Sequence, residues 1–103
     1  MTIYDVEFVP SALREWRKLG SSLRDQFKKK LEERRRNPHV PHDRLTHLSH
    51  CYKIKLRSAG YRLVYEVVDE RLVVMVISVG KRERAEAYET AARRLRDRHN
   101  DRG

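Results

Sequence analysis

The chain begins with a short stretch in which apolar and polar side chains alternate. One set is Tyr4, Val6 and Phe8, and the other is Ile3, Asp5 and Glu7. A period of two is typical of a strand that buries one face. We therefore predict a strand over residues 3 to 9, which Pro10 ends.

Two stretches with apolar residues at helical spacing follow. The stripes are Ala12, Leu13, Trp16 and Leu19 in the first stretch, and Leu23, Phe27 and Leu31 in the second. We expect Ser11 to cap the first helix and Gly20 to end it. The second helix is predicted to end near Asn37 and Pro38. Each stripe indicates a helix that packs one face on a core.

Residues 37 to 50 hold two prolines and four of the five histidines, with little periodicity, which favours a connecting loop. The four histidines are His39, His42, His47 and His50. They raise the possibility of a metal site, but zinc ligands come in tight pairs on a turn or helix, and no cysteine pair accompanies them. We interpret them as solvated loop residues and predict no metal.

From Cys51 the pattern changes to three successive strands, CYKIKLR, YRLVYEVV and RLVVMVISV, separated by short turn segments. Short connections predict an antiparallel meander. The third strand is nearly continuous in apolar residues, which indicates a central position covered on both faces. The second alternates sharply, so we expect it to be half exposed.

A helix from about Glu83 to Arg98 completes the predicted domain. Its apolar stripe is Ala85, Tyr88, Ala92 and Leu95. Because this stripe buries little area, we expect the helix to be loosely docked and easily displaced. The order β-α-α-β-β-β-α predicts an α+β fold, with an antiparallel sheet and the two N-terminal helices on one face. We assign residues 1–103 to one domain, with 97–103 a polar tail.

Positive charge dominates the composition. The chain has 24 Lys and Arg residues against 15 Asp and Glu residues, a formal net charge of +9. Such a surface attracts polyanions, so RNA, DNA or an acidic protein is the expected partner. The alternative is that the excess charge only keeps the protein dispersed.

The sequence also bears on the compartment. The single cysteine, Cys51, lies in an apolar strand pattern, which favours a reducing compartment and a buried side chain over the alternative of a catalytic thiol. No apolar run approaches the ~18 residues of a membrane span, and the N-terminus lacks a signal-peptide layout. We expect a cytoplasmic protein with no membrane partner.

The first meander strand is apolar on one face and cationic on the other, where Lys53, Lys55 and Arg57 lie. A two-residue turn after this strand would place Arg57 opposite Arg62 and Lys53 opposite Glu66. Like charges in register are destabilising, which points to a bound anion such as phosphate. The alternative is a solvated face whose cations protect a sheet edge.

More cations follow where the last strand leads into the last helix, whose N-terminus also favours anions. We predict that five side chains close around one phosphate, and that three others hold flanking RNA. The five are Lys53, Lys55, Arg62, Arg82 and Tyr88, and the three are Arg57, Lys81 and Arg84. Clustered cations stabilise the charge of a five-coordinate phosphorus, so the set is suited to phosphodiester cleavage without a metal or other cofactor.

The acid and base for such cleavage are not obvious, because the cluster contains neither His nor Glu. Crowded cations depress one another's proton affinity, so we expect Lys55 to lose its proton readily and Tyr88 to be favoured as phenolate. Arg82 is a weak acid, since guanidinium holds its proton strongly. Positioning by an outside scaffold must then supply much of the rate.

The segments CYKIKLRSAGYRLVYEV and VVMVISVGKRERAEAY, supported by REWRKLG and FKKKLEE, resemble the RelE toxin family over residues 4 to 95. The resemblance implies a microbial-RNase-type fold and cleavage of mRNA in the ribosomal A site. In that reaction the 2′-OH attacks and a 2′,3′-cyclic phosphate results. It carries the catalytic set over to this chain: Lys53, Lys55, Arg62, Arg82 and Tyr88.

The resemblance also implies partners. These are a RelB-like antitoxin that wraps the toxin and displaces its last helix, the 70S ribosome with mRNA in its A site, and operator DNA reached only through the antitoxin. The loop 39–50 and the extension after Leu95 depart from the family pattern. Two alternatives stay open: a non-catalytic ribosome- or nucleic-acid-binding module, and an inactive antitoxin-binding homologue.

Overall fold

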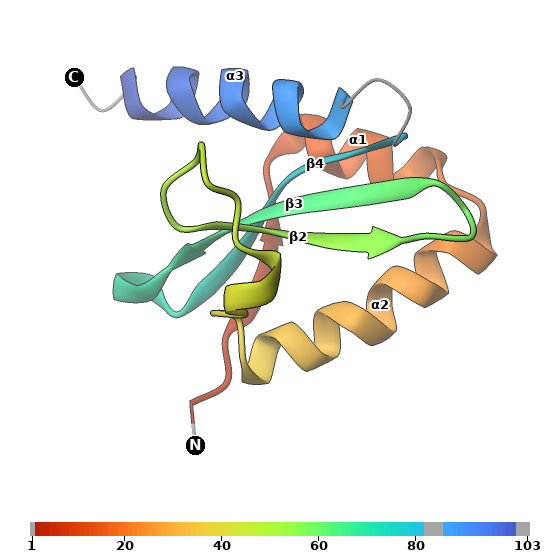
Figure 1. Cartoon of the computed structure of the whole chain (residues 1–103), viewed down its shortest axis with the longest axis horizontal. Helices are drawn as coiled ribbons and strands as arrows, with labels where there is room; N and C mark the ends of the chain where they lie inside the picture. Colours follow the sequence, from red (N-terminus) through yellow and green to blue (C-terminus); the bar gives the residue numbers. More distant parts are fainter. Residues whose placement is uncertain (1, 82–85, 101–103) are drawn as a thin grey trace.

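The computed structural model describes residues 2–81 and 86–100 as three helices on the two faces of a four-stranded sheet (Figure 1). The strands are β1 (Asp5–Phe8), β2 (Cys51–Leu56), β3 (Tyr61–Val68) and β4 (Val73–Lys81). The helices are α1 (Pro10–Lys18), α2 (Ser21–Arg36) and α3 (Glu86–Asn100), with 3-10 turns at Pro41–Asp43 and Asp69–Arg71. The predicted α+β class and element order are confirmed.

The sheet is mixed rather than wholly antiparallel. Its order is β1-β4-β3-β2, and the predicted meander holds for β2, β3 and β4. The strand β1, however, pairs with β4 in parallel, from Asp5 beside Val73 to Phe8 beside Val76. The alternation of residues 3 to 9 tells which face is buried, but it carries no information on the direction of the partner strand.

Helix α1 begins two residues earlier than the sequence suggests. Pro10 occupies its first turn, Val9 is the N-cap residue, and no side chain caps the helix. The prediction that Ser11 caps it was wrong, because proline suits the first helical position, where its missing N–H has no partner to lose. Pro10 thus ends β1 and starts α1.

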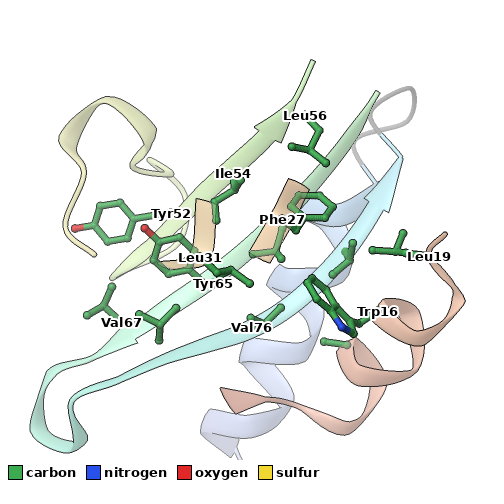
Figure 2. Close-up of a cluster of buried hydrophobic side chains, with 14 of the residues drawn as sticks. Trp16, Leu19, Phe27, Leu31, Tyr52, Ile54, Leu56, Tyr65, Val67 and Val76 are labelled. Carbon is green, nitrogen blue, oxygen red and sulfur yellow. The ribbon is translucent and has the colours of Figure 1, made fainter. Parts of the chain in front are cut away.

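One face of the sheet is covered by α1 and α2. Figure 2 shows Trp16 of α1 and Phe27 and Leu31 of α2 against Ile54 and Tyr65 of the sheet. Phe27 and Ile54 are fully buried, so the helical stripes read from the sequence do form this core.

The other face is covered by α3, and there the predicted stripe was partly wrong. The buried residues are Ala87, Ala91 and Leu95, whereas Tyr88 and Ala92 are only half-buried, at the border of the contact. Ala85 lies outside the described residues. The helix is rotated from expectation because small residues let it lie close to β3 and β4. It runs to Asn100, and so includes the start of the segment 97–103.

The strand β3 is buried, not half exposed. It lies between β2 and β4, and α3 covers the face that its alternation seemed to leave open. Glu66, which made the pattern look amphipathic, is 8% exposed, and its carboxylate accepts a hydrogen bond from Arg98 of α3 at 3.2 Å. The carboxylate of Glu66 is therefore paired with Arg98 instead of being solvated by water.

The histidine-rich segment forms a loop, as predicted, but His39 does more than face solvent. Its imidazole lies 3.0 Å from the carboxylate of Asp69, to which the hydroxyl of Tyr4 also donates at 2.7 Å. The Tyr4 hydrogen bond, chiefly, lowers the pKa of Asp69. Among the residues that the structure describes, no helix has the length and apolar character needed to span a membrane.

Candidate functional site

The β2–β3 hairpin sets the register of the cationic residues. Its loop spans four residues, 57 to 60, and Gly60 takes a positive φ of 70° while its N–H donates to the carbonyl of Leu56 at 2.9 Å. Lys55 is therefore the residue opposite Arg62. The predicted pairing of Arg57 with Arg62 was wrong, because it assumed a two-residue turn. The observed register differs from the predicted register by two residues. Because this is an even number, every side chain still points to its predicted face of the sheet.

The other cross-strand prediction, Lys53 opposite Glu66, changes in the same way. Lys53 lies opposite Val64, and Glu66 lies opposite Cys51 instead of Lys53. Arg57 is exposed in the turn. The like-charge pair expected on this face exists, but it consists of Lys55 and Arg62.

Lys55 responds to this crowding. The positive charge of Lys53 is the largest influence that lowers its pKa, followed by burial and by the charges of Arg62 and Arg57. The direction agrees with the expectation from the sequence, because neighbouring cations favour the neutral amine. Lys55 is thus the residue of this set that most readily supplies a basic nitrogen.

Arg62 is the centre of the arrangement. Its guanidinium carbon lies 5.7 Å from the centroid of the Tyr88 ring, a cation–π contact between β3 and α3. Its Nη1 is buried and has no hydrogen-bond partner among the described residues. A buried charged donor without an acceptor is costly, so the site favours an anion that can accept from it. We call Lys53, Lys55, Arg62 and Tyr88 the cationic cluster.

Tyr88 does not behave as the sequence suggested. Burial raises the pKa of its hydroxyl, and the opposing effect of Arg62 is smaller. The expectation of a phenolate was wrong, because the half-burial of this side chain under the loop could not be foreseen from its neighbours in the chain. At neutral pH Tyr88 is a hydrogen-bond donor.

Of the other predicted residues, Lys81 is exposed at the end of β4, one residue beyond Gly80, which is the partner of Arg62. A Cβ built on Gly80 would lie 3.4 Å from the backbone nitrogen of Ala87, so glycine lets α3 begin close to the cationic cluster. Arg82 and Arg84 lie outside the described residues.

Sequence reasoning missed Arg34, which supports the cluster from the other side of the sheet. Its Nη1 donates to the backbone carbonyl of Lys53 at 3.2 Å and to the hydroxyl of Tyr65 at 2.8 Å, and its Nη2 pairs with Asp43. In the sequence Arg34 is one of three successive arginines. Nothing distinguishes it there from its exposed neighbour Arg36.

A second feature that sequence reasoning missed holds α3, and therefore Tyr88, in place. Arg94 donates to Glu15 of α1 at 2.8 Å and to the carbonyl of Ile77 at 2.7 Å. Glu15 in turn accepts from the backbone N–H of Val79 at 3.1 Å. The two partners are 79 residues apart, too far for a local pattern to reveal.

The residues outside the cluster offer little other chemistry. Cys51 is fully buried, and burial raises the pKa of its thiol to about 12, which keeps it protonated and argues against a catalytic thiol. No group of three or more His, Cys, Asp or Glu side chains in the described segments could hold a metal ion. The cationic cluster is suited to binding a phosphate and stabilising charge that develops on it.

Comparison with protein families identifies a toxin family. The model for the ParE toxin of the type II toxin–antitoxin system parDE matches residues 6–86. The mRNA interferase toxin RelE of Escherichia coli strain K12 is 56% identical over 92 residues, covering 89% of this chain and 97% of the relative. A putative RelE-like toxin protein of Escherichia coli is 50% identical over 93 residues, covering 90% and 98%.

Solved structures show the same likeness. A double arginine-to-alanine variant of Escherichia coli RelE in the free state has a TM-score of 0.85 and 53% identity, covering 91% of this chain and 99% of that one. The intact Escherichia coli RelBE toxin–antitoxin complex has a TM-score of 0.76 and 58% identity, covering 79% and 99%. The RelBE2 complex of Mycobacterium tuberculosis, at 22% identity and a TM-score of 0.62, shares the fold.

Proposed function

Because this chain belongs to the RelE/ParE family of type II toxins, we propose that it cuts mRNA in the A site of the ribosome. The chain is an endoribonuclease, because relatives that are 56% identical to it are named mRNA interferases. The observation that supports the site most strongly is the buried Nη1 of Arg62, which lacks an acceptor among the described residues and lies beside Lys55 and Tyr88.

The proposed reaction uses the cluster as follows. The neutral amine of Lys55 takes the proton of the ribose 2′-OH, and the oxygen attacks the phosphorus. Arg62 stabilises the negative charge that develops on the non-bridging oxygens, and the Tyr88 hydroxyl donates a hydrogen bond to the same phosphate. The bond to the 5′ oxygen then breaks, leaving a 2′,3′-cyclic phosphate and a 5′-hydroxyl. Arg82 is the proposed source of the proton on that hydroxyl.

The cluster is better at stabilising charge than at moving protons. A lysine with a lowered pKa is still mostly protonated at neutral pH, and an arginine is a poor acid. Alignment of the RNA by the ribosome must therefore supply a large share of the rate. Arg57, Lys81 and Arg84 are proposed to hold flanking phosphates, and purified protein should cut naked RNA very slowly.

An antitoxin of the RelB type is the proposed silencing partner. Helix α3 is held mainly by small side chains, Ala87 and Ala91, together with Leu95 and two ion pairs. A partner helix that takes its place would carry Tyr88 away from Arg62. Contact with operator DNA is proposed to occur only through that antitoxin.

The proposal is tested by induced expression followed by mapping of mRNA 3′ ends. Wild-type protein should arrest growth and produce new ends within ribosome-bound codons, whereas Arg62→Ala should lose at least a hundredfold of that cleavage. Arg71→Ala, which removes an exposed arginine on the 3-10 turn after β3, is the matched control and should act like wild type. Equal toxicity of wild type and Arg62→Ala would reject the catalytic site.

The same experiment separates catalysis from binding alone. A module that only binds RNA or an acidic partner should tolerate Arg62→Lys, because the charge is kept. Catalysis should not, because the planar donor that faces the phosphate is lost. Growth arrest without new mRNA ends would favour the binding module.

A further inference from the structure

A groove of about 460 Å³ lies beside the cationic cluster, between the loop that precedes β2 and helix α3. Lys53 and Tyr88 line both the groove and the cluster, so the two are continuous. Figure 1 shows the loop between the 3-10 turn at Pro41–Asp43 and β2 rising toward α3. A polymer whose phosphate is held at Arg62 therefore has the groove within reach of its adjoining nucleotide.

The walls of the groove suit a flat apolar face. Leu45 and Leu48 from the loop and Ala92 from α3 are half-buried, and the ring of Tyr88 completes the lining. Nucleobases bind proteins through such faces, by stacking on aromatic and apolar side chains. The volume exceeds that of one base, which leaves room for bridging water.

The polar side chains at the groove include a carboxylate, which the cluster lacks. Thr46, His47 and Glu89 are exposed there, while Arg44 and Lys53 supply positive charge. The carboxylate of Glu89 repels a phosphate, so the groove does not simply extend the phosphate site. A carboxylate accepts hydrogen bonds only, and it therefore matches a base edge that carries an amino or imino donor.

We propose that this loop–helix groove holds the nucleobase next to the scissile phosphate, and that Glu89 and His47 make it selective among bases. The inference rests on the proposed function, because it takes the polymer to be RNA. It assigns codon preference to α3 and to the loop 44–48, of which the loop departs from the family pattern.

The first test measures cleavage on 70S ribosomes that carry each of the codons in the A site. Glu89→Gln should change the ratio of rates between codons by about tenfold, because a carboxylate reads only donors whereas an amide reads either kind of group. Ala92→Phe, which fills the groove, should flatten the preference. The matched controls Glu70→Gln and His42→Ala alter exposed side chains that do not line the groove, and should keep the wild-type profile.

A second measurement does not depend on cleavage. A 2′-O-methylated trinucleotide with 2-aminopurine next to the central phosphate cannot be cut, and its fluorescence should be quenched by wild type and much less by Ala92→Phe. Quenching without any ribosomal cleavage would support the groove and reject the proposed function.

Two results would overturn the inference itself. One is cleavage by wild type with an identical codon profile in Glu89→Gln and Ala92→Phe, together with equal quenching of the trinucleotide. The other is an unchanged profile accompanied by weaker binding of a RelB-like antitoxin to Ala92→Phe, which would assign the groove to the protein partner.

Discussion

Lys55 shows how one residue acquires its chemistry from its neighbours. Three cations lower its pKa, and Lys53, two residues away on the same face, has the largest effect. The sequence was enough to foresee this, because side chains two apart in a strand share a face. It could not foresee which arginine lies opposite, since that depends on the length of the loop after β2.

The pH dependence of cleavage tests this residue. If Lys55 is the base, the rate rises with pH as Lys55 loses its proton, with a midpoint below that of an ordinary lysine. Lys53→Met removes the cation with the largest effect, so the pKa of Lys55 rises and the profile moves to higher pH. Arg57→Gln should give a smaller move in the same direction. A single-turnover profile that stays fixed in Lys53→Met would exclude Lys55 as the base.

Tyr88 shows where residue-level reasoning from sequence stops. The sequence suggested a phenolate, but burial in the fold raises the pKa of the hydroxyl. Whether a side chain on a helix is buried depends on the rotation of that helix against the sheet, which an alanine-rich stripe leaves undetermined.

The substitution Tyr88→Phe isolates the hydroxyl, since the ring remains to pack on Arg62. We expect cleavage to fall by about tenfold to a hundredfold, because one donor to the phosphate is lost. The shape of the pH profile should not change. Loss of the rising limb in single-turnover kinetics would instead identify Tyr88 as the base.

At the level of elements, the docking of α3 decides whether the cluster is assembled. The helix brings Tyr88 to Arg62 and is fixed by Arg94, whose guanidinium bridges Glu15 and the carbonyl of Ile77. The sequence predicted the existence of α3 and its weak apolar stripe. It did not predict the face that packs, nor an ion pair between residues 79 positions apart.

The substitution Glu15→Gln weakens this fastening. The side chains of Arg94 and Glu15 are 18% and 32% exposed, so the pair is only partly screened and its loss should cost about 1–2 kcal/mol of unfolding free energy. Hydrogen exchange should also become faster in α3, and cleavage should drop as Tyr88 is displaced.

The control for this prediction is Arg71→Gln, which breaks an exposed pair with Glu7. Both of its side chains are about half exposed, so chemical denaturation should show a change close to zero. A similarly small effect of Glu15→Gln, with unchanged exchange in α3, would show that the helix is held by its apolar contacts alone.

For the molecule as a whole, the two faces of one sheet have different tasks. The α1 and α2 face holds the larger core, and the α3 face carries the cationic cluster and the groove. Hydrophobic periodicity was sufficient to predict the α1 and α2 layer, because it records which side chains avoid water, but it left the second face of β3 open to solvent. It does not record strand direction, loop geometry or distant ion pairs, which arise only when the layers pack together.

The net charge of +9 can be interpreted from its distribution over the whole molecule. Much of the charge lies on α2, which is rich in Lys and Arg and has only two buried residues, Phe27 and Leu31. A cationic surface on both sides of the sheet suits a protein that works inside a large polyanion such as the ribosome. In the proposed mechanism, however, catalysis depends on the few cations that converge at Arg62.

Single-turnover cleavage of mRNA on purified 70S ribosomes, with detection of the 2′,3′-cyclic phosphate end, tests this convergence most directly. Wild type and the Arg71→Ala control should form that end at equal rates, and Arg62→Ala should be slower by at least a hundredfold while remaining folded. Formation of the cyclic end by Arg62→Ala at the wild-type rate would contradict the account.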